Sequence, residues 1–102
     1  MTARAVAILA VAACLYCAVP GFAADGTPRD ADQIFATTCG WCHSKGGREP
    51  GKGPRLMGTT LSDAEIASRI RKGKVGYMPP FEGTFSDAEI KGLVAYIRSL
   101  KP

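Results

Sequence analysis

Two cysteines and one histidine within five residues are the part of this sequence with the clearest chemical meaning. Cys39-Gly-Trp-Cys42-His43 is a Cys-x-x-Cys-His pattern, and His43 is the only histidine among the 102 residues. At this spacing two thiols can add to the two vinyl groups of one haem while the imidazole ligates its iron. The pattern therefore predicts one covalently attached c-type haem.

Other uses of the two thiols are weaker predictions. A closed structural zinc site needs four ligands, and the chain after residue 23 has only Cys39, Cys42 and His43 to offer. A thioredoxin-like dithiol belongs with a βαβ pattern, which the sequence lacks. A disulfide between the two cysteines would close only a very short loop and would leave a small core without a stabilising group. Haem attachment is the stronger hypothesis.

The start of the chain is typical of a secretory signal peptide. Residues 5–19 carry no charge, follow one arginine and precede a proline–glycine pair. Small residues at the two positions that signal peptidase inspects predict removal of residues 1–23, which would take Cys14 and Cys17 with them. The stretch is short for a membrane anchor, which needs about 20 apolar residues, and lipidation at Cys14 is also less favoured. A periplasmic location for a single domain, residues 24–102, is expected.

Size and charge limit what this domain can be. Removing the signal leaves about 80 residues, for which one core rarely supplies more than about 3–5 kcal/mol of stability. A large multidomain enzyme is thereby excluded, and a bound haem would add the apolar volume that the core lacks. The formal charge of +4, or +3 without the arginine of the signal, is too small to indicate a nucleic-acid binder.

Three helices are expected to position the site. Asp30 is a suitable N-cap for the first. The pentapeptide Ser-Asp-Ala-Glu-Ile occurs at 62–66 and again at 86–90, and its Ser-x-x-Glu spacing is a capping box before apolar residues at helical spacing. The expected helices are 31–38, 63–72 and 87–100, with Ile34, Phe35, Ile66, Ala67, Ile70, Ile90, Leu93, Val94, Ile97 and Leu100 facing inward.

The segments between these helices are expected to be loops. Residues 44–58 contain five glycines and two prolines, and residues 74–85 contain the consecutive Pro79 and Pro80. No segment has a credible strand pattern. The predicted fold class is therefore all-α, with three to four short helices and long loops rich in glycine and proline.

Residues 24–102 resemble the small bacterial class I cytochromes c along nearly their whole length. Cys39, Cys42 and His43 match the haem-binding motif of that family. The stretch Gly76-Tyr-Met-Pro-Pro-Phe81 is similar to the loop that carries the family's second iron ligand. The resemblance implies the cytochrome c fold, wrapped around one covalent haem c.

The resemblance also implies the roles of individual residues. His43 and Met78 would be the two axial ligands of the iron. The carbonyl group of Pro54 would accept the proton of the proximal imidazole, and Leu56 would lie against the haem. From the residues alone, Met57 is the other candidate ligand, although its position beside Leu56 favours packing, whereas two prolines stiffen the loop that contains Met78.

A helix crossing is implied as well. In the family the first and last helices cross at a small residue and an aromatic pair, which corresponds here to Ala31 and Phe35 against Leu93 and Tyr96. The family often has glycine at the position of Ala31, so a slightly wider crossing is expected.

Two protein ligands on the iron would leave no site for a substrate, so the implied function is a one-electron carrier that cycles between Fe(III) and Fe(II), not an enzyme. The alternative is a haem protein that binds or senses a ligand after displacing Met78. Redox proteins, as components of a dehydrogenase or an oxidase, are the expected partners, through which the otherwise soluble domain could associate with a membrane. No nucleic acid or small-molecule substrate is expected. Cations that could face an acidic docking surface are Lys45, Arg48, Lys52, Arg55, Arg69, Arg71, Lys72 and Lys74.

Overall fold

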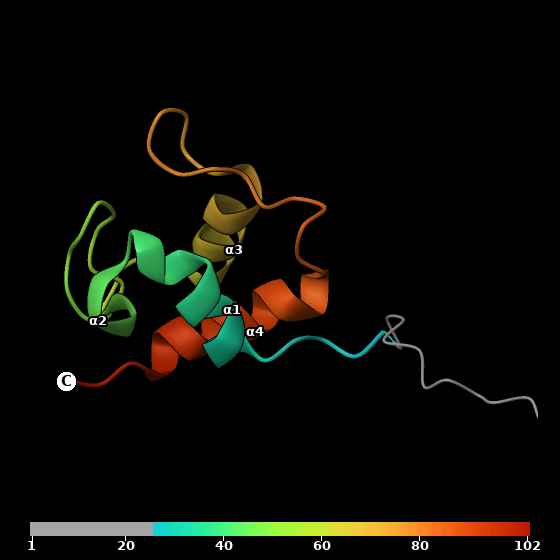
Figure 1. Cartoon of the computed structure of the whole chain (residues 1–102), viewed down its shortest axis with the longest axis horizontal. Helices are drawn as coiled ribbons and strands as arrows, with labels where there is room; N and C mark the ends of the chain where they lie inside the picture. The colour runs from blue at the N-terminus through green and yellow to red at the C-terminus, as the bar shows by residue number, and fades with distance from the viewer. Residues whose placement is uncertain (1–25) are drawn as a thin grey trace, which may run out of the picture.

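The computed structural model describes residues 26–102, and the predicted signal segment, residues 1–23, lies outside them. Between residues 26 and 102 all regular elements are helical, and strand pairing is limited to isolated bridges joining Lys74 to Met78 and Glu82 to Phe85. The all-α prediction is confirmed. The elements are α1 (Ala31–Thr37), the 3-10 turn η1 (Cys39–Trp41), α2 (Ser44–Gly47), α3 (Asp63–Lys72) and α4 (Asp87–Ser99) (Figure 1).

Helix α1 begins as predicted and ends one residue early. The side chain of Asp30 accepts a hydrogen bond from the backbone N–H of Asp32, and Ile34 and Phe35 are buried. The backbone of Thr38 leaves the helical region, although its N–H still donates to the carbonyl of Ile34 at 2.9 Å. The chain therefore passes directly from α1 into the turn that contains the cysteines.

Both capping boxes form. In α3 the hydroxyl of Ser62 accepts from the N–H of Glu65, while the Glu65 carboxylate accepts from the N–H of Ser62, and α4 repeats the arrangement. Helix α3 ends at Gly73, whose φ of 65° suits a residue without a side chain. Helix α4 ends one residue before the predicted bound, with Leu100 as its C-cap.

The first and last helices cross as the resemblance implied. The rings of Phe35 and Tyr96 have centroids 4.7 Å apart, and Leu93 is 1% exposed. A Cβ atom at Gly92 would lie 3.7 Å from the Cβ of Ala31, so Gly92 provides on α4 the space that Ala31 takes on α1. The core cluster consists of Ile34, Phe35, Ile66, Ile70, Phe85, Ile90, Leu93, Val94 and Ile97, with Ala67 partly buried at its edge.

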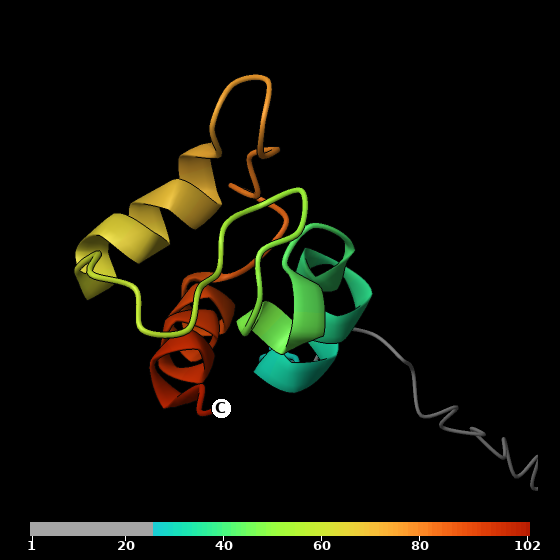
Figure 2. The ribbon, with the colours of Figure 1, turned by 90° about the vertical axis from the view of Figure 1, so that its left-hand side faces the viewer.

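Two long loops complete the domain. In Figure 2, α3 stands apart from α1 and η1, the loop that includes residues 50–60 runs between them, and α4 lies below. The loop after α3 projects from the end of that helix. The first residues of the predicted 44–58 loop form the short element α2 instead, in which Lys45 and Gly46 have φ of 53° and 66°. None of the helices between residues 26 and 102 is long and apolar enough to span a bilayer.

Candidate functional site

The two cysteines and the histidine come from one tight turn. The carbonyl of Cys39 accepts hydrogen bonds from the N–H groups of Cys42 and His43, at 3.2 and 3.0 Å. Because this turn follows α1 immediately, the three side chains are attached to a short, well-anchored piece of backbone.

The thiols do not have the character of a catalytic dithiol. Cys39 and Cys42 are both free thiols of intermediate burial. Burial, together with the neighbouring Cys42, raises the pKa of the Cys39 thiol to about 11. Reactive thiols in disulfide enzymes have a lowered pKa. The raised pKa of Cys39 therefore argues against the thiol-disulfide hypothesis, and both thiols are free for attachment.

The imidazole of His43 is buried and held in one orientation. Its Nδ1 atom lies 2.8 Å from the carbonyl oxygen of Pro54, and the residue is 8% exposed. Since a carbonyl oxygen can only accept, Nδ1 donates the hydrogen, and in the neutral imidazole the lone pair is then on Nε2. Nε2 is thus the nitrogen that can ligate a metal ion.

Gly53 also contacts this ring, and the sequence analysis did not single it out. A Cβ atom at Gly53 would lie 2.7 Å from Cε1 of His43, closer than real side-chain contacts allow. The backbone N–H of Gly53 donates to the carbonyl of Cys42 at 2.8 Å. The sequence does contain one signal for this contact, because Gly53 directly precedes Pro54. A loop that brings the carbonyl of Pro54 to the imidazole must also pass close to the ring, where a side chain would not fit.

A cavity of about 300 Å³ opens between the cysteine turn, the loop around residues 52–56, α3 and the loop around residues 77–81. Ligand-binding cavities typically begin at about this volume. All six predicted site residues lie on its wall: Cys39, Cys42, His43, Pro54, Leu56 and Met78.

The remainder of the wall is apolar with a few cations. Ile66, Ile70, Phe81 and Ile97 supply apolar surface. The charged residues among the described lining residues are all cations, namely Lys52, Arg69 and Lys74. Such a cavity favours an apolar ligand that carries negative charge at its edge.

The two candidate methionines occupy different places. Met78 is half-buried on the cavity wall, in a turn where Lys74 and Met78 exchange two backbone hydrogen bonds of 2.8 Å. Met57 is not among the lining residues, and its N–H donates to the carbonyl of Gly47 at 3.0 Å. The structure thus brings Met78, and not Met57, to the cavity that His43 lines.

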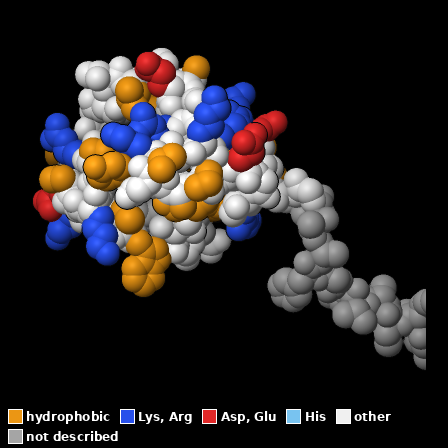
Figure 3. All heavy atoms as spheres, turned by 90° about the horizontal axis from the view of Figure 1, so that it is seen from above, with side chains coloured by type: hydrophobic (Ala, Val, Ile, Leu, Met, Phe, Trp, Pro, Cys, Tyr) orange, Lys and Arg blue, Asp and Glu red, His pale blue; other side chains and the backbone are white. Residues whose placement is uncertain are grey.

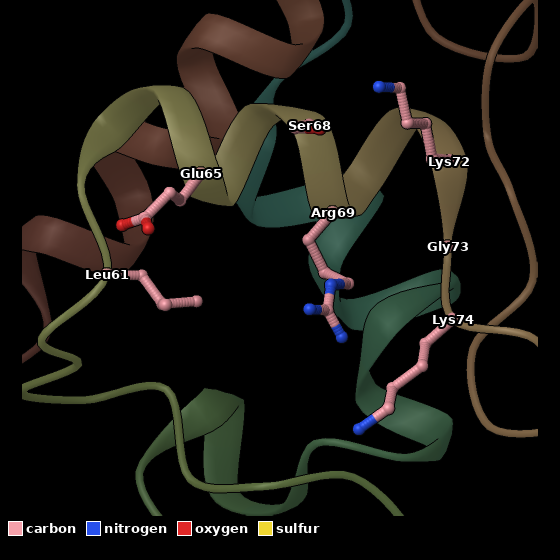
Figure 4. Close-up of a pocket in the computed structure, with 7 residues that line it drawn as sticks. All are labelled: Leu61, Glu65, Ser68, Arg69, Lys72, Gly73 and Lys74. Carbon is pink, nitrogen blue, oxygen red and sulfur yellow. The ribbon is translucent and has the colours of Figure 1, made fainter.

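A second, more open pocket of about 360 Å³ lies beside this cavity along α3. The two share Leu61, Arg69 and Lys74. Figure 4 shows the side chains of these three residues directed into the same open space. The charged residues of this pocket are three cations, Arg69, Lys72 and Lys74, and one anion, Glu65, so the approach to the cavity from this side has a net positive charge.

The surface around the projecting loop combines apolar and cationic side chains. Val75 and Tyr77 are 97% and 81% exposed, and so is Trp41 of the cysteine turn at 81%. Figure 3 views the molecule from the side of this loop and shows apolar side chains near the centre of the face, with several Lys and Arg side chains around them.

An all-α domain that places two cysteines and a histidine on one turn, beside an apolar cavity, matches the arrangement expected from the resemblance to class I c-type cytochromes. The family model described as cytochrome c oxidase, cbb3-type, subunit III matches residues 26–97. This chain therefore belongs to the monohaem class I c-type cytochromes, which are electron carriers and not enzymes, and it carries one covalently bound haem c.

Individual relatives agree with this membership. The chain is 33% identical to the cbb3-type cytochrome c oxidase subunit FixP of Bradyrhizobium diazoefficiens over 79 residues, which cover 68% of this chain but only 26% of that subunit. It is 33% identical to cytochrome c6 of a Synechococcus species, covering 76% of this chain and 72% of the relative. The solved structure of cytochrome c6 from the diatom Phaeodactylum tricornutum has a TM-score of 0.54 at 31% identity, covering 66% of this chain and 85% of the other.

The residues of the cavity fit haem c. The two thiols suit its vinyl groups, Nε2 of His43 and the thioether of Met78 suit its iron, and the apolar wall suits its ring. The cations on the wall suit the two carboxylates at the ring edge.

Proposed function

We propose that this chain transfers single electrons between redox proteins, with haem c attached through Cys39 and Cys42 and its iron held by His43 and Met78. Bound haem c supplies the reversible Fe(III)/Fe(II) couple. The observation that carries the proposal is the convergence of these four side chains on one cavity whose other walls are largely apolar.

His43 is the proposed proximal ligand, and its neighbours prepare it for this role. The hydrogen bond from Nδ1 to Pro54 orients the ring and makes Nε2 a stronger base, which is a common way to tune a metal ligand. Gly53 lets the loop backbone lie against the ring. Because the hydrogen bond to Pro54 occupies Nδ1, it is Nε2 that faces the proposed iron site.

Met78 is the proposed second ligand. A thioether is a soft ligand that stabilises reduced iron and raises the potential. Two protein ligands would leave no coordination position for a substrate. Leu56, Ile66 and Phe81 line the cavity as well, and their side chains would keep water away from the iron.

The partners are proposed to be redox proteins with acidic docking surfaces. Support comes from the cations beside the cavity, Lys52, Arg69 and Lys74, and from the apolar side chains that lie among such cations in Figure 3. The likeness to a subunit of a cbb3-type oxidase favours an oxidase component as one partner. Removal of residues 1–23 and a periplasmic location are part of the same proposal.

The decisive experiment expresses the full chain in a host that attaches haem c and compares Met78→Ala with the matched control Met57→Ala. The mass and a pyridine haemochrome spectrum of the exported protein test haem attachment and signal removal. Met78→Ala should lower the reduction potential and allow the reduced protein to bind carbon monoxide, whereas Met57→Ala should do neither. Rapid carbon monoxide binding by the unaltered protein would favour the ligand-sensing alternative, and an unchanged spectrum in Met78→Ala would remove Met78 from the iron.

A further inference from the structure

Arg29 ties the segment before α1 to the start of α4. Its backbone N–H and its Nε both donate to Oε2 of Glu89, at 3.1 and 2.7 Å. One terminal nitrogen donates to Oε1 of Glu89 at 3.4 Å and to the carbonyl of Thr84 at 3.3 Å. A single side chain thereby holds both a carboxylate and the loop backbone that precedes α4.

The same guanidinium covers an aromatic pair that leads to the cavity. It lies 5.5 Å from the centroid of the Phe85 ring, which is a cation–π contact. Phe85 is buried and stacks on Phe81, with ring centroids 5.0 Å apart at 19°. Phe81 lines the cavity, three residues after Met78. Arg29 is therefore linked by direct contacts to the wall on which Met78 lies.

Apart from Arg29, the segment between Met78 and α4 is held by Phe85, which is buried in the core, and by backbone hydrogen bonds. The N–H of Phe81 donates to the carbonyl of Ile70 at 3.0 Å, and the N–H of Glu82 donates to that of Arg71 at 3.1 Å. These bonds fasten the segment to the end of α3. Arg29, which precedes α1, fastens the same segment through partners that lie 55 and 60 residues later in the chain.

We infer that Arg29 is a positioning residue for Met78: through Glu89 and Phe85 it holds residues 79–85 in the place that keeps the thioether on the iron. The inference rests on the proposed role of Met78. Loops with few buried contacts open at a lower free energy than the whole domain. A thioether is a weak ligand, so the opening of this loop determines how often the iron becomes accessible. Loss of the Arg29 contacts makes that opening more frequent.

The test measures how fast added imidazole replaces methionine in the ferric holoprotein. An external ligand can bind only in the fraction of molecules in which the loop has released the iron. Arg29→Ala should raise the observed binding rate about tenfold, the change that corresponds to about 1.4 kcal/mol. Arg29→Lys keeps a cation beside Glu89, so its imidazole-binding rate should be much closer to that of the parent protein. The methionine-to-iron charge-transfer band should weaken most in Arg29→Ala and less in Arg29→Lys.

Arg98→Ala is the matched control. Arg98 donates to Asp63 at 2.7 Å and to the carbonyls of Thr59 and Leu61. With a similar set of bonds it fastens the loop before α3, which lines the cavity at Thr59 and Leu61 but contains no proposed iron ligand. The control removes the same charge and should leave the imidazole rate close to that of the parent protein. Equal rate increases in Arg29→Ala and Arg98→Ala would overturn the inference, because they would report only a general loss of stability.

The parent protein separates this inference from the proposed function. If its charge-transfer band is absent, or survives in Met78→Ala, the assignment of Met78 is wrong and the inference falls with it. If the band is present and depends on Met78, while the Arg29 variants bind imidazole at the parent rate, the inference alone is wrong. Should Arg29→Ala not accumulate as holoprotein, Glu89→Gln weakens the same contact from the other side and is expected to change the rate in the same direction.

Discussion

The starts of α3 and α4 share the pentapeptide Ser-Asp-Ala-Glu-Ile, and their local structures are nearly identical. The two capping serines, Ser62 and Ser86, have φ of −68° and ψ of 163° and 162°. Each serine hydroxyl accepts from the glutamate N–H at 3.1 Å, and each glutamate accepts in return, at 2.7 Å in α3 and 2.9 Å in α4. The local sequence is therefore sufficient to determine the cap.

The two glutamates nevertheless have different surroundings. Glu65 is exposed, and its contacts with Ser62, first the backbone N–H and then the hydroxyl, lower the pKa of its carboxyl. Glu89 is buried, and the pKa of its carboxyl is lowered to about 2, chiefly by the hydrogen bond from Arg29 and next by the backbone of Ser86. The same five residues thus start a helix in one place, and in the other they start a helix and also connect distant segments near the haem cavity.

The largest expected difference between the two starts comes from replacing the glutamates. Glutamine preserves the capping box, because its amide oxygen still accepts from the serine N–H. Glu89→Gln should lower the free energy of unfolding by about 1–3 kcal/mol, since it removes the charge from hydrogen bonds to Arg29. Glu65→Gln should change it far less. Guanidinium unfolding of both holoproteins measures the difference, and equal losses would show that Arg29 adds nothing to the cap.

Replacing the serines should produce a smaller effect that is the same at both helices. Ser62→Ala and Ser86→Ala each remove one acceptor for a helix N–H, which costs about 1 kcal/mol. The same unfolding experiment compares them. A clearly greater loss for Ser86→Ala would contradict the view that the cap is purely local, because it would mean that the hydroxyl also supports the contact between Glu89 and Arg29.

The features that the sequence predicts well here are the local ones. The capping boxes and the apolar spacing predicted α3 at its observed bounds, Asp63–Lys72, and α4 to within one residue. Cys39, Cys42 and His43 are adjacent in the chain, so their shared turn follows from short-range geometry. The resemblance to the cytochrome family added Met78, which is far from His43 in the sequence and meets it at the cavity.

The features that it misses depend on contacts between distant segments. Gly53 matters because a loop backbone passes the His43 ring, and Gly92 matters because α1 crosses α4 at that point. The contact of Arg29 with Glu89 spans 60 residues. No periodicity or short motif carries the information for Gly92 or for the Arg29 contact, and for Gly53 the one signal was its position directly before Pro54. The left-handed backbone of Lys45, which allows the short element α2, was hidden for another reason: residues other than glycine seldom adopt it.

The two helix starts should also differ in how their contributions to stability depend on pH. The pKa of Glu89 falls from an ordinary 4.5 to about 2 on folding, so the folded state holds this proton less tightly than the unfolded state. The stability that Glu89 contributes is therefore complete above pH 4.5 and is lost as the pH falls toward about 2.

The difference in unfolding free energy between the parent protein and Glu89→Gln should stay constant from neutral pH down to about 4.5 and shrink below it. Taking this difference cancels the titration of groups that do not interact with Glu89. The corresponding difference for Glu65→Gln should shrink with the same sign but by less, because Glu65 is exposed and lacks the Arg29 contact. If the difference in unfolding free energy between the parent protein and Glu89→Gln stays unchanged well below pH 4.5, the charge of Glu89 does not stabilise the fold.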